Sequence, residues 1–470
     1  MSPEERRWRP GYRALKIVRG PRGSRLYSIH WRTTKGMNGW LHDASDRWNM
    51  SAIRRLLPSS FSAAPGDLEA LTRRGEEEDP QALGLAPGSL EQLWQGVEAL
   101  YQSGAHPAIQ CCVRLGGGVV LNRSLGLVSG RPYRPGEIDP EDVMGLDTPV
   151  NLFSASKAIT AMLVHKLDEE NVLRLDDRVA DYIPEFARHG KGEITVRHVL
   201  AHRAGLSKLP PEAMDLDLLA QPERILEVLC DARPESSPGG RLAYHAVSGG
   251  FILGEVLRRA ADSPLRNLLR EKIAIPLGLR WLGYGVPAEQ VDQVAINTAT
   301  GFPLLPPLSN ILRRVLSTDL DSLVRLSNDP RFLTGVIPSA NIISTASETA
   351  TFYQCLLDEG QYRGNRVFDA RTIRQATEPQ TGWELDFTLW APIPYSLGFM
   401  LGSRSLGLFG FDNPQAFGHL GLSNVFTWAD PERALVVALL TTGKPILGGH
   451  LVPLLGLLRD LGRVFPKTPG

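Results

Sequence analysis

A serine and a lysine stand three residues apart, at Ser154 and Lys157, in the stretch NLFSASKAIT. The preceding DTPVNLF is typical of a short extended segment, and the following ASKAITAMLVHKL is apolar on nearly every side, as in a helix buried inside a domain. Residues three apart on a helix share a face, so the hydroxyl and the amine should meet. A buried ammonium is unfavourable, and a lysine that loses its proton becomes a general base for a neighbouring hydroxyl. The pair therefore predicts nucleophilic chemistry at Ser154.

Two later stretches extend this pattern. GRLAYHAVSGGFILGEVLRRA places Tyr244 in a turn just ahead of an apolar helix, and FGHLGLSNVFTWADPERALVVALL places HLG, His419 to Gly421, at the start of a strand pair. A Ser-x-x-Lys, a turn tyrosine and a (Lys/His)-x-Gly strand, in this order, resemble the motif set of the serine β-lactamase and penicillin-binding superfamily. More closely, residues 88–465 resemble the class C β-lactamase group, which includes D-Ala-D-Ala carboxypeptidases, family VIII carboxylesterases and an acyltransferase. ITVRHVLAHRAGL and YSLGFMLG lie at the expected places in that order.

The resemblance implies a role for each matched residue. Ser154 would be the acylated nucleophile and Lys157 its base partner. Tyr244 would move a proton between the nucleophile and the leaving group.

It also implies how the reacting carbonyl would be held. His419 and Gly421 would belong to a strand that lines the site. The backbone N–H groups of Ser154 and Leu422 would form the oxyanion hole, a donor pair that typically stabilises the transition state by several kcal/mol.

One departure from the group concerns substrate class. Its β-lactamases and peptidases usually carry Tyr-x-Asn, whose amide holds the amide of the substrate, and this chain has Ala246 in that place. An ester has less need of such a partner. HLG also lacks the lysine of true class C β-lactamases. Both differences favour a carboxylesterase or acyltransferase on small to medium esters over the alternative, a D-amino-acid peptidase or β-lactamase.

Two alternatives belong to other classes of protein. A catalytically silent relative would use its cleft only to bind, but such a protein is expected to have lost motif residues that are all present here. A scaffold or assembly role would rest on residues 1–85, which are basic and contain Trp8, Trp31, Trp40 and Trp48. Gel filtration with and without that segment would separate this role from a monomeric enzyme.

Composition is that of an ordinary globular protein, with 470 residues, 43% hydrophobic and 22% charged. The net charge of zero favours neither nucleic acid nor an anionic membrane as partner. No apolar run is long enough to span a membrane, and MSPEERRWRPGYRALK lacks the apolar core of a signal peptide. Four cysteines, two of them adjacent at Cys111 and Cys112, do not form a disulfide framework. We expect a cytoplasmic enzyme with reduced thiols, a small-molecule ester or amide substrate and no cofactor.

The elements around the motifs predict an α/β (α+β) fold. SLEQLWQGVEALYQSG is typical of an amphipathic helix, and AIQCCVRLGGGVVLNRSLGLV of two strands joined by a glycine-rich turn. NVFTWAD and RALVVALLTTG are expected to be antiparallel strands around DPE, followed by a closing helix. One antiparallel sheet would then be built from both chain ends and flanked by helices, beside an all-helical lobe. We place a domain boundary after the charge run RRGEEEDP, with a basic extension at 1–85 and the hydrolase domain at 86–470.

Two patterns resemble other kinds of site. HVLAH has His198 and His202 at the spacing of a zinc helix, but Val199 replaces the glutamate of His-Glu-x-x-His, so we expect no metal there. The amphipathic C-terminal helix is expected to cover the sheet rather than lie on a membrane.

Overall fold

The computed structural model describes residues 67–134, 136–209, 215–316 and 318–467, and separately the short strands β1 (Val18–Arg19) and β2 (Arg25–Leu26). The latter two pair antiparallel with each other. The four N-terminal tryptophans lie outside the described residues.

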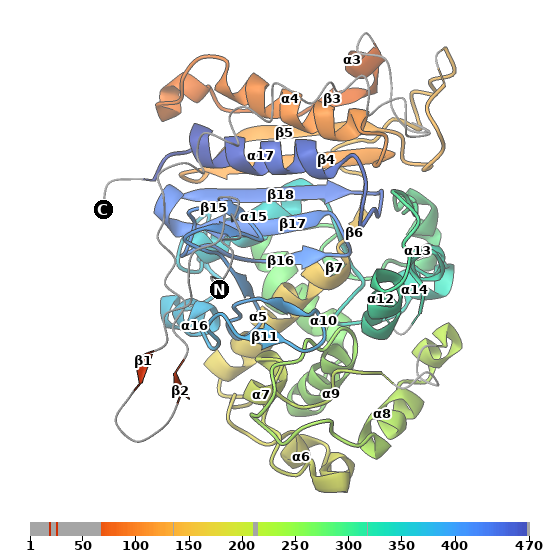
Figure 1. Ribbon diagram of the computed structural model, residues 1–470, viewed down its shortest axis with the longest axis vertical. Coiled ribbons are helices and arrows are strands. Elements are labelled where there is room, and N and C mark those ends of the chain that lie inside the picture. The colour runs from red at the N-terminus through yellow and green to blue at the C-terminus, as the bar shows by residue number, and fades with distance from the viewer. Residues whose placement is uncertain are drawn as a thin grey trace, which may run out of the picture. The chain divides into compact units, whose positions relative to one another are not determined.

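The larger compact unit of the chain is Leu57–Gly470. One antiparallel sheet of seven strands, in the order β13-β16-β17-β18-β4-β5-β3, forms its centre. Strand β18 pairs with β4, so that Leu439 lies opposite Cys111 and strands from both ends of the chain are neighbours (Figure 1). The predicted sheet built from both chain ends is therefore confirmed. The strands are β3 (Thr72–Arg74), β4 (Ala108–Leu115), β5 (Gly118–Gly126), β13 (Met400–Leu401), β16 (Phe417–Gly421), β17 (Val425–Asp430) and β18 (Leu435–Thr441).

The hairpin between β4 and β5 shows why this sequence forms tight strand pairs. Gly116 and Gly117 make a two-residue connection with φ values of 56° and 93°, which glycine adopts without a steric penalty. Side chains then alternate between two hydrophobic clusters, because successive strand residues point to opposite faces. Cys111 and Val113 lie in one cluster, and Cys112 in the other. All four cysteines of the chain are free and buried.

Helices cover both faces of the sheet. Helices α4 (Ser89–Gln102) and α17 (Leu451–Val464) pack against each other and bury their apolar faces in the cluster that contains Cys111 (Figure 1). Helices α5 (Ser156–Glu169) and α15 (Ala346–Leu357) contribute to the opposite cluster. The closing helix therefore covers the sheet, as expected.

A helical lobe lies beside the sheet (Figure 1), with α9 at its centre, in contact with α5, α6, α7 and α8. The predicted α+β architecture is confirmed. Among the helices of the described residues, none combines the length and the apolar character that crossing a bilayer would require. The remaining helices are α3 (Leu68–Leu71), α6 (Val179–Tyr182), α7 (Val196–Leu200), α8 (Pro222–Asp231), α9 (Ser248–Ala261), α10 (Leu265–Leu269), α11 (Ile275–Leu277), α12 (Leu308–Leu316), α13 (Leu320–Leu326), α14 (Pro330–Thr334) and α16 (Ala370–Thr377).

Short strands connect these parts. A three-stranded sheet in the order β6-β8-β7 lies next to the start of α5, and three two-stranded hairpins lie in the last third of the chain. They are β6 (Val150–Asn151), β7 (Gly283–Tyr284), β8 (Ile342–Ser344), β9 (Gln361–Tyr362), β10 (Asn365–Arg366), β11 (Leu385–Asp386), β12 (Ala391–Pro392), β14 (Leu406–Gly407) and β15 (Gly410–Phe411).

The sheet takes in residues that precede the boundary predicted at 85. Strand β3 pairs with β5, and Thr72 lies opposite Leu125. The charge run before the predicted boundary is partly ion-paired, because Glu77 lies 2.7 Å from Arg123, whose side chain is 5% exposed. The acidic residues of this run therefore help to fix the edge of the sheet.

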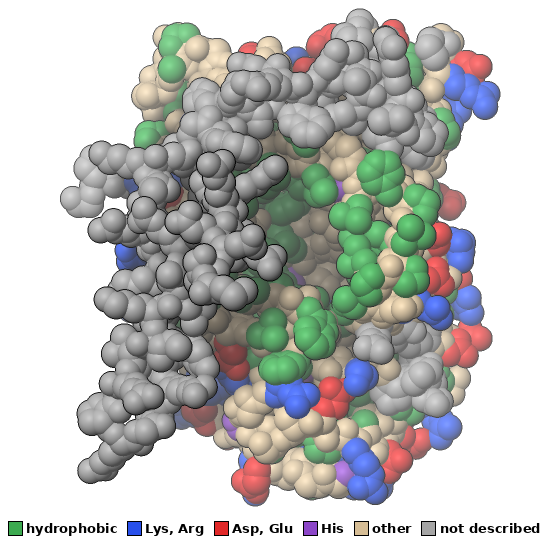
Figure 2. Space-filling view, viewed as in Figure 1, with side chains coloured by type: hydrophobic (Ala, Val, Ile, Leu, Met, Phe, Trp, Pro, Cys, Tyr) green, Lys and Arg blue, Asp and Glu red, His purple; other side chains and the backbone are tan. Residues whose placement is uncertain are grey.

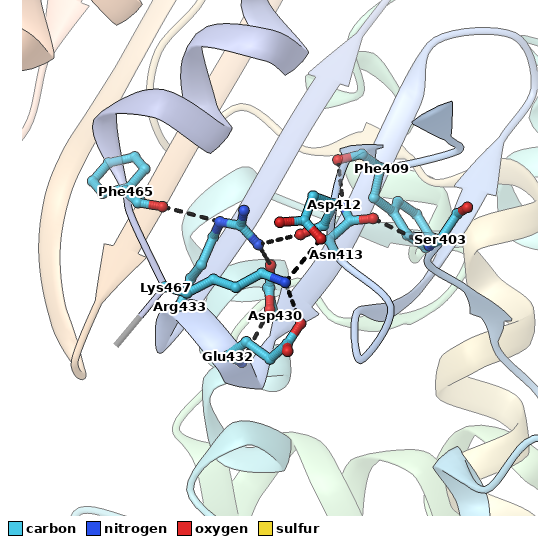
Figure 3. Close-up of polar contacts among 9 residues, drawn as sticks. All are labelled: Ser403, Phe409, Asp412, Asn413, Asp430, Glu432, Arg433, Phe465 and Lys467. Atoms are coloured by element: carbon cyan, nitrogen blue, oxygen red, sulfur yellow. Dashed lines mark hydrogen bonds and ion pairs between the residues drawn. The ribbon is translucent and has the colours of Figure 1, made fainter. Parts of the chain in front are cut away.

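A buried ion pair anchors the end of the chain beside the β17–β18 turn. Arg433 binds the carboxylate of Asp430 at 2.8 Å and donates to the carbonyl oxygens of Phe465 and Asp412 at 3.0 and 2.9 Å (Figure 3). Lys467 adds an exposed pair with Asp412 at 3.0 Å. Because a buried charge needs its partners, this network fixes the C-terminal residues to the sheet.

Candidate active site

Ser154 lies in a serine turn, Phe153–Ala155, which is one turn of 3-10 helix between β6 and α5. Phe153 has a φ of 48°, in the left-handed region that costs a bulky residue about 1–2 kcal/mol. Asn151 supports this conformation, because its side-chain oxygen accepts a hydrogen bond from the Phe153 N–H at 3.0 Å. Ser154 is half-buried between two buried neighbours. The turn therefore presents one hydroxyl from an otherwise buried segment.

Lys157 lies in the first turn of α5, one helical turn beyond the serine. Its Nζ is 3.1 Å from Ser154 Oγ, 2.7 Å from the carbonyl oxygen of Ala246 and 3.1 Å from that of Ser339. Burial lowers the pKa of Lys157 to about 7. A large fraction of Lys157 is therefore in its neutral form near physiological pH.

The three partners of Lys157 fix where its proton-accepting lone pair points. A neutral amine has two N–H groups and one lone pair. The carbonyl oxygens of Ala246 and Ser339 can only accept, so they take both N–H groups. The lone pair is left for the hydroxyl of Ser154, which this arrangement can deprotonate.

Tyr244 lies on the other side of the serine, in the irregular segment before α9. Its side chain interacts with that of Ser154, and its ring centroid is 4.8 Å from Lys157 Nζ. Burial raises the pKa of Tyr244, its interaction with Ser154 lowers the pKa, and the charge of Asp386 raises it. Tyr244 therefore stays protonated and can give a proton to a leaving group.

Asp386, which no sequence pattern indicated as a site residue, holds the segment that carries Tyr244. Its buried carboxylate accepts hydrogen bonds from the backbone N–H of Tyr244 at 3.2 Å, those of Thr388 and Leu389 at 2.7 and 2.9 Å, and the hydroxyl of Tyr395 at 3.1 Å. The ring of Tyr395 is stacked on that of Tyr244 at 6.4 Å. Four donors therefore satisfy one buried carboxylate directly beside the candidate tyrosine.

The two histidines of HVLAH have separate positions. His198 is at the start of α7, where its Nδ1 accepts from the backbone N–H of Thr195 at 3.2 Å. His202 packs edge-on against Tyr244 and Tyr395, with ring centroids 4.8 and 5.0 Å away. Within the described ranges, no group of three or more His, Cys, Asp or Glu side chains is arranged to hold a metal ion. His202 thus supports the tyrosine, a position that its spacing to His198 did not indicate.

Strand β16 brings the third motif against the serine turn. A Cβ on Gly421 would collide with the carbonyl oxygen of Leu152, so only glycine allows this approach. His419 Nδ1 donates to the carbonyl oxygen of Leu420 at 2.7 Å, and burial lowers the pKa of His419 to about 3. The ring is therefore neutral, and its centroid lies 6.2 Å from that of Tyr244. Half-buried Leu422 follows the strand directly.

Comparison with known proteins identifies the family. Residues 91–451 match the family described as Beta-lactamase, and the chain belongs to it. Esterase/beta-lactamase LipL of Mycobacterium tuberculosis is 28% identical over 312 residues, which cover 62% of this chain and 69% of LipL. The structure of a family VIII carboxylesterase matches with a TM-score of 0.66 and 27% identity, over 80% of this chain and 97% of that one. A penicillin-binding protein homologue from Caulobacter crescentus matches with a TM-score of 0.66 and 26% identity, over 81% and 99%.

The resemblance predicted from the motifs is therefore confirmed. The chain has the fold shared by serine β-lactamases and penicillin-binding proteins, and it is a hydrolase of that family.

Proposed function

We propose that this protein is a serine hydrolase that acts through an acyl-enzyme on Ser154, and that it is a carboxylesterase, or an acyltransferase, on small to medium esters. The observation that carries the proposal is the contact set of Lys157, whose lone pair is free for the Ser154 hydroxyl while both N–H groups bind carbonyl oxygens.

Acylation then requires a general base, an oxyanion hole and a general acid. Lys157 takes the proton of Ser154, and Oγ attacks the ester carbonyl carbon. The N–H groups of Ser154 and Leu422 stabilise the oxyanion. As the tetrahedral intermediate collapses, the carbon–oxygen bond to the alcohol breaks and Tyr244 gives its proton to the departing oxygen.

Deacylation reverses the proton transfers. Water attacks the acyl group and gives a proton to the Tyr244 oxygen, while Lys157 returns its proton to Ser154 Oγ. The acid leaves, and both side chains regain their starting states. An alcohol or amine in place of water would give acyl transfer.

The residue at position 246, an alanine, favours an ester over an amide as substrate. Its carbonyl oxygen is occupied by Lys157, and its side chain is a methyl group that cannot bind the N–H of a substrate amide. The names of two relatives, an esterase/beta-lactamase and a family VIII carboxylesterase, agree with this preference. The alternative, a peptidase or β-lactamase, draws support from the penicillin-binding protein homologue.

The test is turnover of p-nitrophenyl esters of rising acyl length beside a chromogenic cephalosporin, with Ser154→Ala as the blank. We expect ester hydrolysis that Ser154→Ala abolishes, with slow cephalosporin turnover. Faster cleavage of the cephalosporin or of a D-peptide than of every ester would replace the esterase with the alternative. No turnover of any of them, with a folded protein, would favour a silent binding relative.

A further inference from the structure

A side cleft of about 340 Å³ lies next to the segment that carries Tyr244. One wall is Ile311 and Val315 of α12, which are four residues apart and so share a face of the helix. The other wall is Phe387 and Trp390, in the loop that joins β11 to β12. The volume suits an organic group of moderate size.

The segment that carries Tyr244 forms part of the lining of the side cleft. Ala243, the residue before Tyr244, lines it. The loop of the second wall is tied to the same segment, because the Phe387 N–H donates to the Leu242 carbonyl oxygen at 3.0 Å. In the proposed mechanism Tyr244 protonates the departing alcohol, so a residue that lines the side cleft directly precedes the proposed proton donor.

The walls are apolar but not packed into the core. Phe387 is 44% exposed and Trp390 61%, while Ile311 and Val315 are only half-buried. Figure 2 shows hydrophobic side chains on both sides of a hollow in this face, over α12 and over the β11–β12 hairpin. Exposed apolar walls around a hollow next to a reactive group indicate a site for an apolar part of a ligand.

One positive charge at the rim lacks an acidic partner. Arg241 is exposed and its guanidinium lies 4.7 Å over the ring of Phe387, but among the described residues it makes no ion pair. The other cation of the cleft, Lys208, is paired with Glu235 at 3.2 Å. Arg241 is therefore available to an anionic group on a molecule stacked along the aromatic wall.

We propose that the side cleft binds the leaving alcohol of the ester, and that this alcohol carries an aromatic or alicyclic group and a carboxylate that pairs with Arg241. The ring lies between the aromatic wall and α12, and the carboxylate reaches Arg241 at the rim. This inference rests on the proposed function and adds the class of its substrate.

The test of the charge compares 6-acetoxy-2-naphthoate with its methyl ester, so that the acyl group is the same and only the carboxylate changes. Release of the naphthol is followed by fluorescence. In Arg241→Gln, kcat/KM for the acid should fall about fivefold, as for an exposed ion pair, and that for the methyl ester should stay within about twofold. Arg280→Gln is the matched control, since Arg280 lies 4.7 Å over Trp281 and does not line the side cleft.

The test of the aromatic wall uses two tryptophans of similar exposure. Trp390→Ser should lower kcat/KM for both naphthyl esters about tenfold relative to ethyl acetate. Trp383→Ser, at a residue 60% exposed and outside the lining, should not. Equal effects of Arg241→Gln on the acid and its methyl ester, or equal effects of the two tryptophan variants, would overturn the proposal.

Binding separates this proposal from the proposed function. Ser154→Ala should bind 6-hydroxy-2-naphthoate in a fluorescence titration, and the added Arg241→Gln should weaken that binding about fivefold. Arg241-dependent binding in a protein that hydrolyses no ester would support the side cleft and reject the esterase. Ester hydrolysis by the native enzyme without such binding would support the esterase and reject the side cleft as the site of the alcohol.

Discussion

The backbone N–H of Tyr244 donates to Asp386 Oδ1 at 3.2 Å, and the two residues are 142 positions apart in the chain. Through this bond the segment with the candidate proton donor is held by the same carboxylate that shapes the loop of the side cleft. We therefore expect substrate selection and proton transfer to depend on one residue that touches neither substrate nor the reacting atoms.

Asp386→Asn tests this positioning role. Asparagine keeps the shape and an oxygen for the backbone donors, but it removes the charge that raises the pKa of Tyr244. The pKa of Tyr244 should fall, so any high-pH loss of kcat that reflects tyrosine ionisation should move to lower pH. Asp369→Asn, at an exposed carboxylate near α16, is the control. An unchanged pH profile with reduced thermal stability would mean that Asp386 is only structural.

Ser154 should be the residue that reacts. A fluorophosphonate should give an adduct on the peptide that contains FSASK, located by mass spectrometry at Ser154. Ser156 provides an internal control, since it is buried and its Oγ accepts from the backbone N–H of Ile342 at 2.9 Å. Labelling of another serine, or full activity in Ser154→Ala, would contradict the assignment.

Lys157 should be active in its neutral form. Burial lowers its pKa to about 7, so kcat/KM should rise with pH up to about 7 and then level off, and activity should be lost as pH falls through that value. Lys157→Arg should abolish acylation, because guanidinium remains protonated. Lys166→Arg, on the same helix and paired with Glu169, should be nearly unaffected. A normal burst in Lys157→Arg would show that the lysine only positions the serine.

Ala246 should set the preference for esters over amides. Ala246→Asn restores an amide that can bind the substrate N–H, which is worth about 1–3 kcal/mol, or roughly ten- to a hundredfold in rate. The ratio of cephalosporin to ester turnover should rise accordingly. Ala246→Leu, similar in size but without hydrogen-bonding groups, should not raise it. If the ratio of cephalosporin to ester turnover rises equally in both variants, the added side-chain volume alone explains the change.

Gly421 should be needed for the approach of β16 to the serine turn. Because a Cβ would collide with the Leu152 carbonyl oxygen, Gly421→Ala should displace the strand that carries the proposed oxyanion donor. Losing one such donor lowers kcat by about 10²–10³. Gly456→Ala, in α17 with open space around it, should retain activity. Near-normal activity in Gly421→Ala would exclude this strand from the oxyanion hole.

Patterns local in sequence predicted most of the fold and part of the candidate site. The burial of α5 and the β4–β5 hairpin follow from local patterns, and the motifs led to Ser154, Lys157 and Tyr244. Asp386 could not be found this way, because an acidic residue in a loop is ordinary until its distant donors are known. The left-handed φ of Phe153 has no signature either, since phenylalanine gives no preference for it.

The pairing of β4 with β18 also constrains when the protein can become active during its synthesis. Ser154 leaves the ribosome long before β16, β17 and β18, yet the sheet and the wall of the site need these last strands. The early strands must therefore wait, unpaired on one side, for most of the chain to be made. Such long-range closure slows folding and exposes strand edges in the interim. Nascent chains should thus remain inactive until β18 has emerged and paired with β4.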